Sequence, residues 1–175
     1  MNEIIKKNAI NFGLISGLIS VLITTIIYVI DLKYFTEWWV GILSIVISLF
    51  LSIYLMIKTR KNLNNDFPFK TAFTTYFIYT VIGLTIMTLF NIVLFNFIDP
   101  EAKEAIKEHV IKFTVDLMEK FNSPREAIKE AVKELKTKDQ YSIGSQVQGL
   151  FMSIVFSSIF GLILAAFFKS EKRQF

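Results

Sequence analysis

The chain has 175 residues, of which 53% are hydrophobic and 19% charged, and its formal net charge is +4. A soluble domain has roughly 45–50% apolar and roughly 25% charged residues, whereas here the apolar residues form four long blocks, so a soluble globular protein is excluded. Because the chain has no cysteine, disulfides, thiol catalysis and cysteine-based metal sites are excluded as well.

Four apolar blocks are long enough to cross a membrane, since about 20 residues rising about 1.5 Å each span the hydrocarbon core. The first is longer than the apolar region of a signal peptide, about 7–15 residues. No Ala-x-Ala site follows it, so we expect it to remain in the mature protein. Trp38 and Trp39 precede the second block and are predicted to lie in an interfacial aromatic belt. The predicted spans are residues 9–30, 40–57, 73–98 and 147–168.

Residues 99–146 separate the third and fourth spans and have the pattern of a helical hairpin. Asp99 and Pro100 are residue types that begin a helix. Ser123 and Glu126 have the spacing of a capping box, which would begin a second helix. Each helix has a predicted apolar stripe, formed by Ile106, Val110, Phe113, Leu117 and Phe121 in the first and by Ile128, Ala131, Val132 and Leu135 in the second.

The hairpin is smaller than the about 70–80 residues at which a core becomes self-sufficient. We therefore expect the two stripes to pack against each other and to dock on the top of the bundle. The alternatives are contact with the outer leaflet or with another protein. The stripe residues are accordingly the candidates for docking a partner.

The distribution of Lys and Arg predicts the orientation of the spans. With the N-terminus inside, the inner segments carry a net charge of +6 and the outer segments −2. Both termini are therefore predicted to be cytoplasmic and the hairpin extracytoplasmic. Topology accounts for the basic excess, and no nucleic-acid-binding motif accompanies it, so no nucleic-acid partner is expected. The inner basic residues are Lys6, Lys7, Lys58, Arg60, Lys61, Lys70, Lys169, Lys172 and Arg173.

Small residues recur at every fourth position in three of the spans, which is a spacing that lets membrane helices approach closely. The longest stripe is in the fourth span. Two interpretations are open: packing within one four-helix bundle, which we favour, and contact with a second copy or another membrane protein. The residues are Gly13 and Gly17 in the first span, Ser44, Ser48 and Ser52 after Gly41 in the second, and Gly149, Ser153, Ser157, Gly161 and Ala165 in the fourth.

The four spans contain no Asp, Glu, Lys, Arg or His, the residue types that mark ion pathways and proton relays in membranes. Asn91 lies in the third span together with a series of threonines, and an interhelical hydrogen bond is favoured there over a ligand contact. His109 is the single histidine, so no zinc site is expected. We predict no catalytic, cofactor-binding or metal-binding residues.

Four short motifs carry a family resemblance over nearly the whole chain. They are Asn11-Phe12-Gly13 with Gly17, Phe69-Lys70-Thr71-Ala72-Phe73, Ile98-Asp99-Pro100-Glu101 and Phe121-Asn122-Ser123-Pro124. With them the chain resembles a bacterial family of small four-span inner-membrane proteins, domain of unknown function 4199 (DUF4199). The resemblance implies a four-span architecture and a location in the bacterial inner membrane, and it implies no activity. The family often has a glycine pair where this chain has Asn62-Leu63-Asn64-Asn65.

The predicted fold is an all-α integral membrane protein with four transmembrane helices and an extracytoplasmic hairpin. The predicted function is a non-enzymatic accessory or interaction subunit of the bacterial inner membrane. It would use its small-residue helix faces and its hairpin to bind itself or another membrane protein. The alternative is a small channel or transporter, with an uncharged route for an unidentified solute past Asn91 and the threonines of the third span.

Overall fold

The four apolar blocks form four long helices in the computed structural model, which describes residues 2–170. The most apolar windows of these helices have hydropathies of 2.2 to 2.6, so each helix can cross a membrane. This confirms the predicted all-α membrane fold. In chain order the elements are α1 (Glu3–Ile30), the 3₁₀ turn η1 (Leu32–Thr36), α2 (Trp38–Asn62), α3 (Phe69–Val93), the π-helical turn η2 (Leu94–Ile98), α4 (Ala102–Lys120), α5 (Arg125–Thr137) and α6 (Ile143–Phe168).

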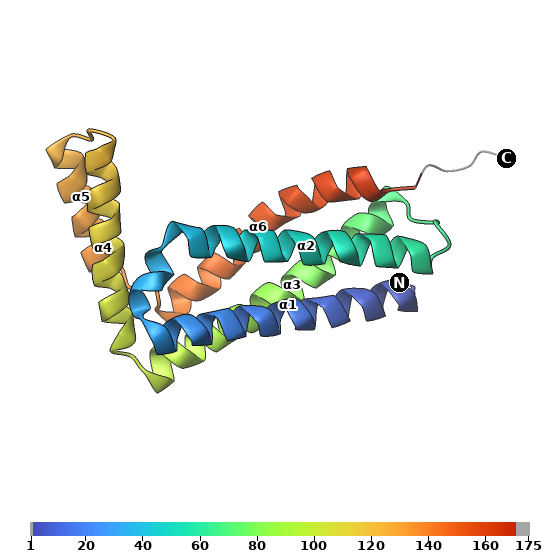
Figure 1. Ribbon diagram of the computed structural model, residues 1–175, viewed down its shortest axis with the longest axis horizontal. Helices are drawn as coiled ribbons and strands as arrows, with labels where there is room; N and C mark the ends of the chain where they lie inside the picture. The colour runs from blue at the N-terminus through green and yellow to red at the C-terminus, as the bar shows by residue number, and fades with distance from the viewer. Residues whose placement is uncertain (1, 171–175) are drawn as a thin grey trace.

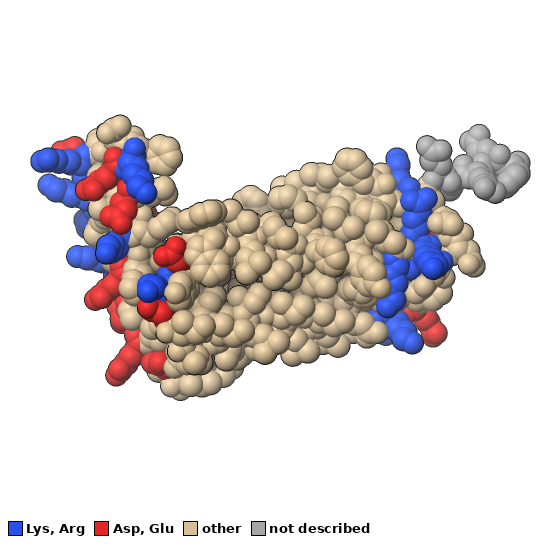
Figure 2. Space-filling model, viewed as in Figure 1, with Lys and Arg blue, Asp and Glu red and all other residues tan. Residues whose placement is uncertain are grey.

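The two ends of the bundle differ in their charged residues. The first residues of α1, the α2–α3 loop and the last residues of α6 lie at one end, called here the terminal end, and α4 and α5 cross the other, the hairpin end (Figure 1). Lys and Arg form a band at the terminal end, the middle is apolar, and the hairpin end carries both signs of charge (Figure 2). Glu171, Lys172 and Arg173, which entered the predicted inner charge, lie outside the described residues.

α1 and α3 pack closely because two glycines of α1 face α3. A Cβ atom added to Gly17 would lie 2.7 Å from the Cβ of Ile86, and one added to Gly13 would lie 2.8 Å from the Cβ of Ile82. Contacts this short are essentially never made by real Cβ atoms, so glycine is what lets the two backbones approach. The glycine pair of the first span therefore belongs to the interior of this bundle.

All four long helices contribute to an apolar core at the terminal end. Within it, the side-chain amide of Asn8 donates a hydrogen bond of 3.2 Å to the hydroxyl of Thr59, which satisfies a buried polar pair between α1 and α2. Ser170 ties the end of α6 to the α2–α3 loop through two hydrogen bonds of 2.8 Å with the backbone of Phe67. The core residues are Phe12, Leu55, Met56, Phe67, Ala72, Tyr76, Tyr79 and Ala165.

Asparagines end α2 and α4 with left-handed backbone conformations. The φ angles are 51° at Asn64, 65° at Asn65 and 52° at Asn122. In both places the amide two residues beyond the C-cap donates to a carbonyl of the last turn, which is a Schellman motif. Asparagine tolerates this conformation better than other residues with a side chain. Asn64 and Asn65 therefore provide the left-handed backbone that ends α2.

The capping box predicted at Ser123 and Glu126 does not form. α5 begins at Arg125, and no side-chain hydrogen bond caps it in the described part of the chain. The reason is that Ser123 belongs to the end of α4, where its backbone N–H donates to the carbonyl of Met118 at 2.9 Å. The other hairpin helix, α4, has Glu101 at its N-cap position without a side-chain cap bond, but the Asp99 carboxylate accepts a hydrogen bond from the backbone N–H of Ala102, its first residue, at 3.1 Å.

A second apolar cluster joins the hairpin to the bundle. Phe95 of η2 is buried between Phe35 and Tyr141, with ring centroids 5.8 and 4.7 Å away. Ile106 of α4 is fully buried in the same cluster, so the first turns of α4 are docked on the bundle. The cluster consists of Leu94, Phe95, Ala102 and Ile106, with Tyr28, Leu32, Phe35, Phe90, Val110 and Tyr141 packed around them.

The hairpin lies across the end of the bundle, and its tip extends past the bundle (Figure 1). α5 packs along α4, and its four stripe residues are half-buried while its charged residues are exposed. In the part of α4 beyond Val110, the half-buried residues are Ile111, Thr114, Val115 and Met118. The α4 stripe from Phe113 to Phe121 is exposed instead. The two predicted stripes thus do not face each other, because α5 covers a different side of α4.

Candidate functional site

The small-residue stripe of α6 is packed in one half of the helix and bare in the other. At the terminal end Gly161 and Ala165 are buried, and a Cβ added to Gly161 would lie 2.5 Å from the ring of Tyr76. Ser157 is half-buried, whereas Ser153 and Gly149 are exposed. A Cβ added to Gly149 would meet no described atom within 4 Å. Residues that are equivalent in the sequence therefore have different surroundings.

α2 is divided in the same way. Its buried residues, Ser52, Leu55, Met56 and Thr59, are all in the half toward the terminal end. Toward the hairpin end, Ser44 is half-buried and Ser48 exposed. A Cβ added to Gly41 would also meet no described atom within 4 Å. Ser44 and Ser48 face a cavity between α1, α2 and α3. The small residues that are unpacked near the hairpin are therefore Gly41 on α2 and Gly149 and Ser153 on α6, and these form the candidate interaction site.

A shallow hollow adjoins the bare half of α6. It has a volume of about 230 Å³ and includes the side chain of Gln148, which is exposed on a helix that can cross a membrane. An amide without a hydrogen-bond partner is costly in hydrocarbon, so a polar side chain at a helix surface favours contact with another helix. The hollow is lined by Lys138, Gln140, Ser145, Gln148, Gly149 and Met152.

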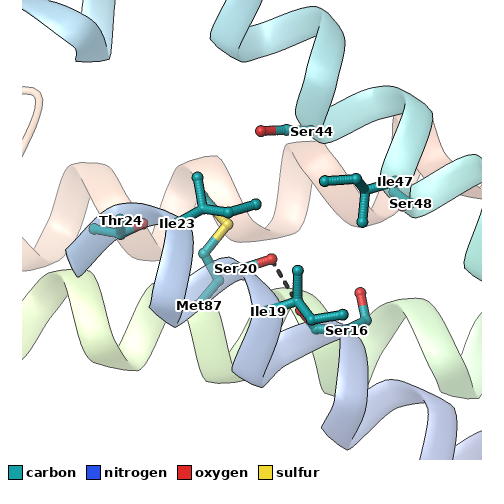
Figure 3. Close-up of a pocket in the computed structure, with 9 residues that line it drawn as sticks. All are labelled: Ser16, Ile19, Ser20, Ile23, Thr24, Ser44, Ile47, Ser48 and Met87. Atoms are coloured by element: carbon teal, nitrogen blue, oxygen red, sulfur yellow. Dashed lines mark hydrogen bonds between the residues drawn. The ribbon is translucent and has the colours of Figure 1, made fainter. Parts of the chain in front are cut away.

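A second, smaller cavity of about 80 Å³ lies between α1, α2 and α3. Figure 3 shows its hydroxyl-bearing side chains on α1 and α2 and Met87 behind them. The hydroxyls of Ser20 and Ser44 donate to carbonyls of their own helices, at 3.0 and 2.9 Å, so these donors are already satisfied. The cavity is lined by Ser16, Ile19, Ser20, Ile23, Thr24, Ser44, Ile47, Ser48 and Met87.

Tyr79 of α3 links the three helices next to this cavity. Its hydroxyl lies 3.2 Å from the carbonyl oxygen of Ser48 and 3.4 Å from the hydroxyl oxygen of Ser16. It thereby connects α3 to α2 and to α1. This role of Tyr79 has no signal in the sequence, because a tyrosine in an apolar span does not indicate which helices it bridges.

The interhelical hydrogen bond expected at Asn91 is made by Asn96 instead. The buried Oδ1 atom of Asn91 has no hydrogen-bond partner among the described residues. The Asn96 amide donates to the carbonyl of Ile92 at 3.1 Å and to that of Tyr141 at 2.9 Å. Asn96 reaches the start of α6 because it lies in η2, the π-helical turn that sequence periodicity did not indicate.

Two carboxylates hold the base of the hairpin. Asp99 accepts hydrogen bonds from the hydroxyl of Tyr28 at 2.8 Å and from the backbone of Ala102, and these bonds lower its pKa below the ordinary 3.8. Burial raises the pKa of Asp139, but hydrogen bonds from Lys103 at 2.9 Å and from the backbone of Tyr141 outweigh it, so this pKa is lowered too. The ionised form of each carboxylate is the better hydrogen-bond acceptor, so ionisation of both groups stabilises the docked hairpin.

We expect docking of the hairpin to weaken in acid. Because both folded-state pKa values are lowered, the stabilisation is complete above the ordinary carboxyl pKa and is lost as the pH falls below about 4. Amide exchange of α4, corrected for the intrinsic pH dependence of exchange, should accelerate in this range. Combining Asp99→Asn with Asp139→Asn should remove the acid step, and an unchanged step in this variant would contradict the assignment.

The remaining predicted positions carry no further site. Trp38 and Trp39 are exposed in the first turn of α2, and Trp39 contacts Tyr34 edge to face at 5.8 Å. His109 is half-buried on α4. Among residues 2–170, no group of three or more His, Cys, Asp or Glu side chains is arranged to hold a metal ion.

Comparison with known proteins gives one match. The family model described as "Protein of unknown function (DUF4199)" matches residues 11–170, which is most of the chain. The comparisons with curated proteins and with solved structures give no match.

Proposed function

This chain belongs to the DUF4199 family of proteins of unknown function, and we propose that it is a non-enzymatic interaction subunit of the bacterial inner membrane. In this proposal a transmembrane helix of a second copy or of another membrane protein packs on the bare halves of α2 and α6. The terminal end of the bundle faces the cytoplasm, and the hairpin lies on the other side. The band of Lys and Arg at the terminal end supports this orientation.

The observation that carries the proposal is the division of the α6 stripe. Lipid-facing helix surfaces need no small residues, whereas helix–helix contacts in membranes do. Gly161 and Ala165 make such contacts within the chain. Gly149 and Ser153 have the same spacing but are exposed. The exposed amide of Gln148 next to them supports the same conclusion, because a partner helix would supply its hydrogen-bond partner.

We expect Gly149→Leu to break a complex and to leave the single subunit folded. A leucine at this position has open space in the isolated chain, but it would hold a partner helix away by the width of its side chain. The measurement is the mass of the complex purified from native membranes in mild detergent, together with the helical signal on heating. The mass should fall to that of one subunit, and the melting curve should not change.

Gly161→Leu is the matched control, because it has the same change on the same stripe. Its Cβ would collide with the Tyr76 ring at 2.5 Å, so this variant should damage the single subunit. The proposal fails if the wild type purifies without any partner, or if Gly149→Leu retains the mass of the wild-type complex.

A channel or transporter has weaker support. The route suggested by the sequence ran past Asn91 and the threonines of α3, whereas the cavity between the helices is lined mainly by α1 and α2. At about 80 Å³ it has room for a few water molecules. The hydroxyls of Ser20 and Ser44 are bound to their own helices, which favours a role in packing.

A further inference from the structure

The exposed part of the α4 stripe is an apolar surface that the bundle leaves uncovered. It consists of Phe113, Leu117 and Phe121, called here the α4 strip, and Phe121 is 76% exposed. α5 does not cover it, since α5 packs on the side of α4 that carries Ile111, Val115 and Met118. Three large apolar side chains in a row on a helix outside the spans require a partner.

The direction in which the α4 strip points follows from Ile106 and Val110, which belong to the same predicted stripe and are docked on the bundle. Ile106 and Val110 pack on the end of the bundle, in the cluster around Phe95. The strip continues at spacings of three and four residues, which keeps it on the same face of the helix. The hairpin lies across the bundle, and its tip extends past it (Figure 1). The strip therefore faces the same way as Ile106, toward the bilayer beside the bundle.

The depth of α4 agrees with this direction. α4 docks on η1, the turn that directly precedes Trp38 and Trp39. Exposed tryptophans at the end of a membrane helix lie at the level of the lipid headgroups. The acidic residues Glu108 and Glu119 are about 200° around the helix from Ile106 and Leu117 at 100° per residue. Lys120 lies about 60° from Leu117, and a lysine at this depth can extend its amine to the headgroups. Because residues 99–146 have a net charge of only −1, apolar contact rather than attraction between charges dominates the binding of the hairpin to the membrane.

We infer that the α4 strip is inserted into the leaflet at the hairpin end of the bundle. The hairpin is then an amphipathic anchor that lies in the plane of the membrane, with its apolar face about 5–10 Å into the boundary between headgroups and acyl chains. Its ligand is the lipid surface itself, and zwitterionic lipid is sufficient. This inference requires that the four long helices cross the membrane, and it does not depend on the proposed partner helix.

Spin labelling tests this inference directly, because the chain has no cysteine and each introduced one is a single site. Leu117→Cys, Phe121→Cys and the control Glu119→Cys are each labelled with a nitroxide and placed in phosphatidylcholine nanodiscs at one copy per disc. Collision rates are measured with oxygen, which concentrates in lipid, and with a water-soluble nickel chelate. We expect the labels at Leu117 and Phe121 to meet nickel severalfold less often, and oxygen more often, than the label at Glu119.

Equal nickel access at all three positions would overturn the inference, because a strip that binds a second copy or another protein is open to water in a disc with one copy. Spin–spin broadening at Leu117 in discs with two copies, together with nickel access in discs with one, would assign the strip to self-association instead. Phe121 is the most exposed position of the strip, so its label keeps the test valid if Leu117→Cys disturbs the hairpin.

Discussion

Gly17→Leu is expected to separate α1 from α3 and to abolish the folded bundle. A Cβ at this position would lie 2.7, 2.8 and 2.9 Å from three side-chain atoms of Ile86, and leucine adds three further carbon atoms. Overpacking a core by smaller amounts costs about 1–3 kcal/mol, and here the closest contact between two central helices is affected. The measurement is the elution profile in mild detergent and the loss of helical signal on heating.

Gly41→Leu is the matched control for this change. It is a glycine in another long helix, and its added Cβ would meet no described atom within 4 Å. We expect the melting temperature of this variant, measured on the single subunit, to match that of the wild type, because Gly41 lies on the candidate interaction site and not in the interior of the bundle. If Gly17→Leu also matched the wild type, α1 and α3 would not be in the close contact described above.

Phe95→Ala is expected to release the hairpin from the bundle. Phe95 is 1% exposed and fills the space between Phe35 of η1 and Tyr141 before α6. Removing a buried phenylalanine ring costs about 3–5 kcal/mol, and this ring lies where η1, η2 and α4 meet. Amide exchange of α4 should accelerate strongly, while the terminal-end core around Leu55 should keep its protection.

Phe97→Ala provides the comparison within the same π-helical turn. Phe97 is two residues further along and 70% exposed, so its removal should leave exchange in α4 unchanged. Equal effects of the two substitutions would show that the hairpin is not held by the aromatic cluster. Loss of protection throughout the chain on Phe95→Ala would show that the two ends of the bundle unfold together.

The stripe of α6 shows how far the sequence predicts the candidate site. The five small residues are equivalent in spacing and type, so the choice between internal packing and an external partner stayed open. In the structure only one half of the stripe is packed inside the chain, and the other half is exposed. The terminal half packs within the chain, where Gly161 accommodates the ring of Tyr76, and near the hairpin Gly149 is uncovered. The position of this change depends on the course of α3, which the α6 sequence does not contain.

The hairpin shows the same limit of prediction from the sequence. Its helices and its main stripe follow from periodicity, but α4 has a second half-buried side, formed by Ile111, Val115 and Met118, that α5 covers. The sequence favoured an interhelical hydrogen bond at Asn91. The π-helical turn shifts the register after Val93, and it is Asn96 that reaches the backbone of Tyr141. A π-helical turn of five residues is too short to be recognised from hydrophobic spacing.

The sequence alone determined the number of spans, the apolar middle of the bundle and the collection of basic residues at one end. These properties depend on the composition of each segment, because the transfer of a helix into lipid depends on its own side chains and internal hydrogen bonds. Only the tertiary structure decided which faces meet. Periodicity identifies a face of a helix but not its neighbour, and in lipid a small-residue face is equally suited to a helix of the same chain or of another.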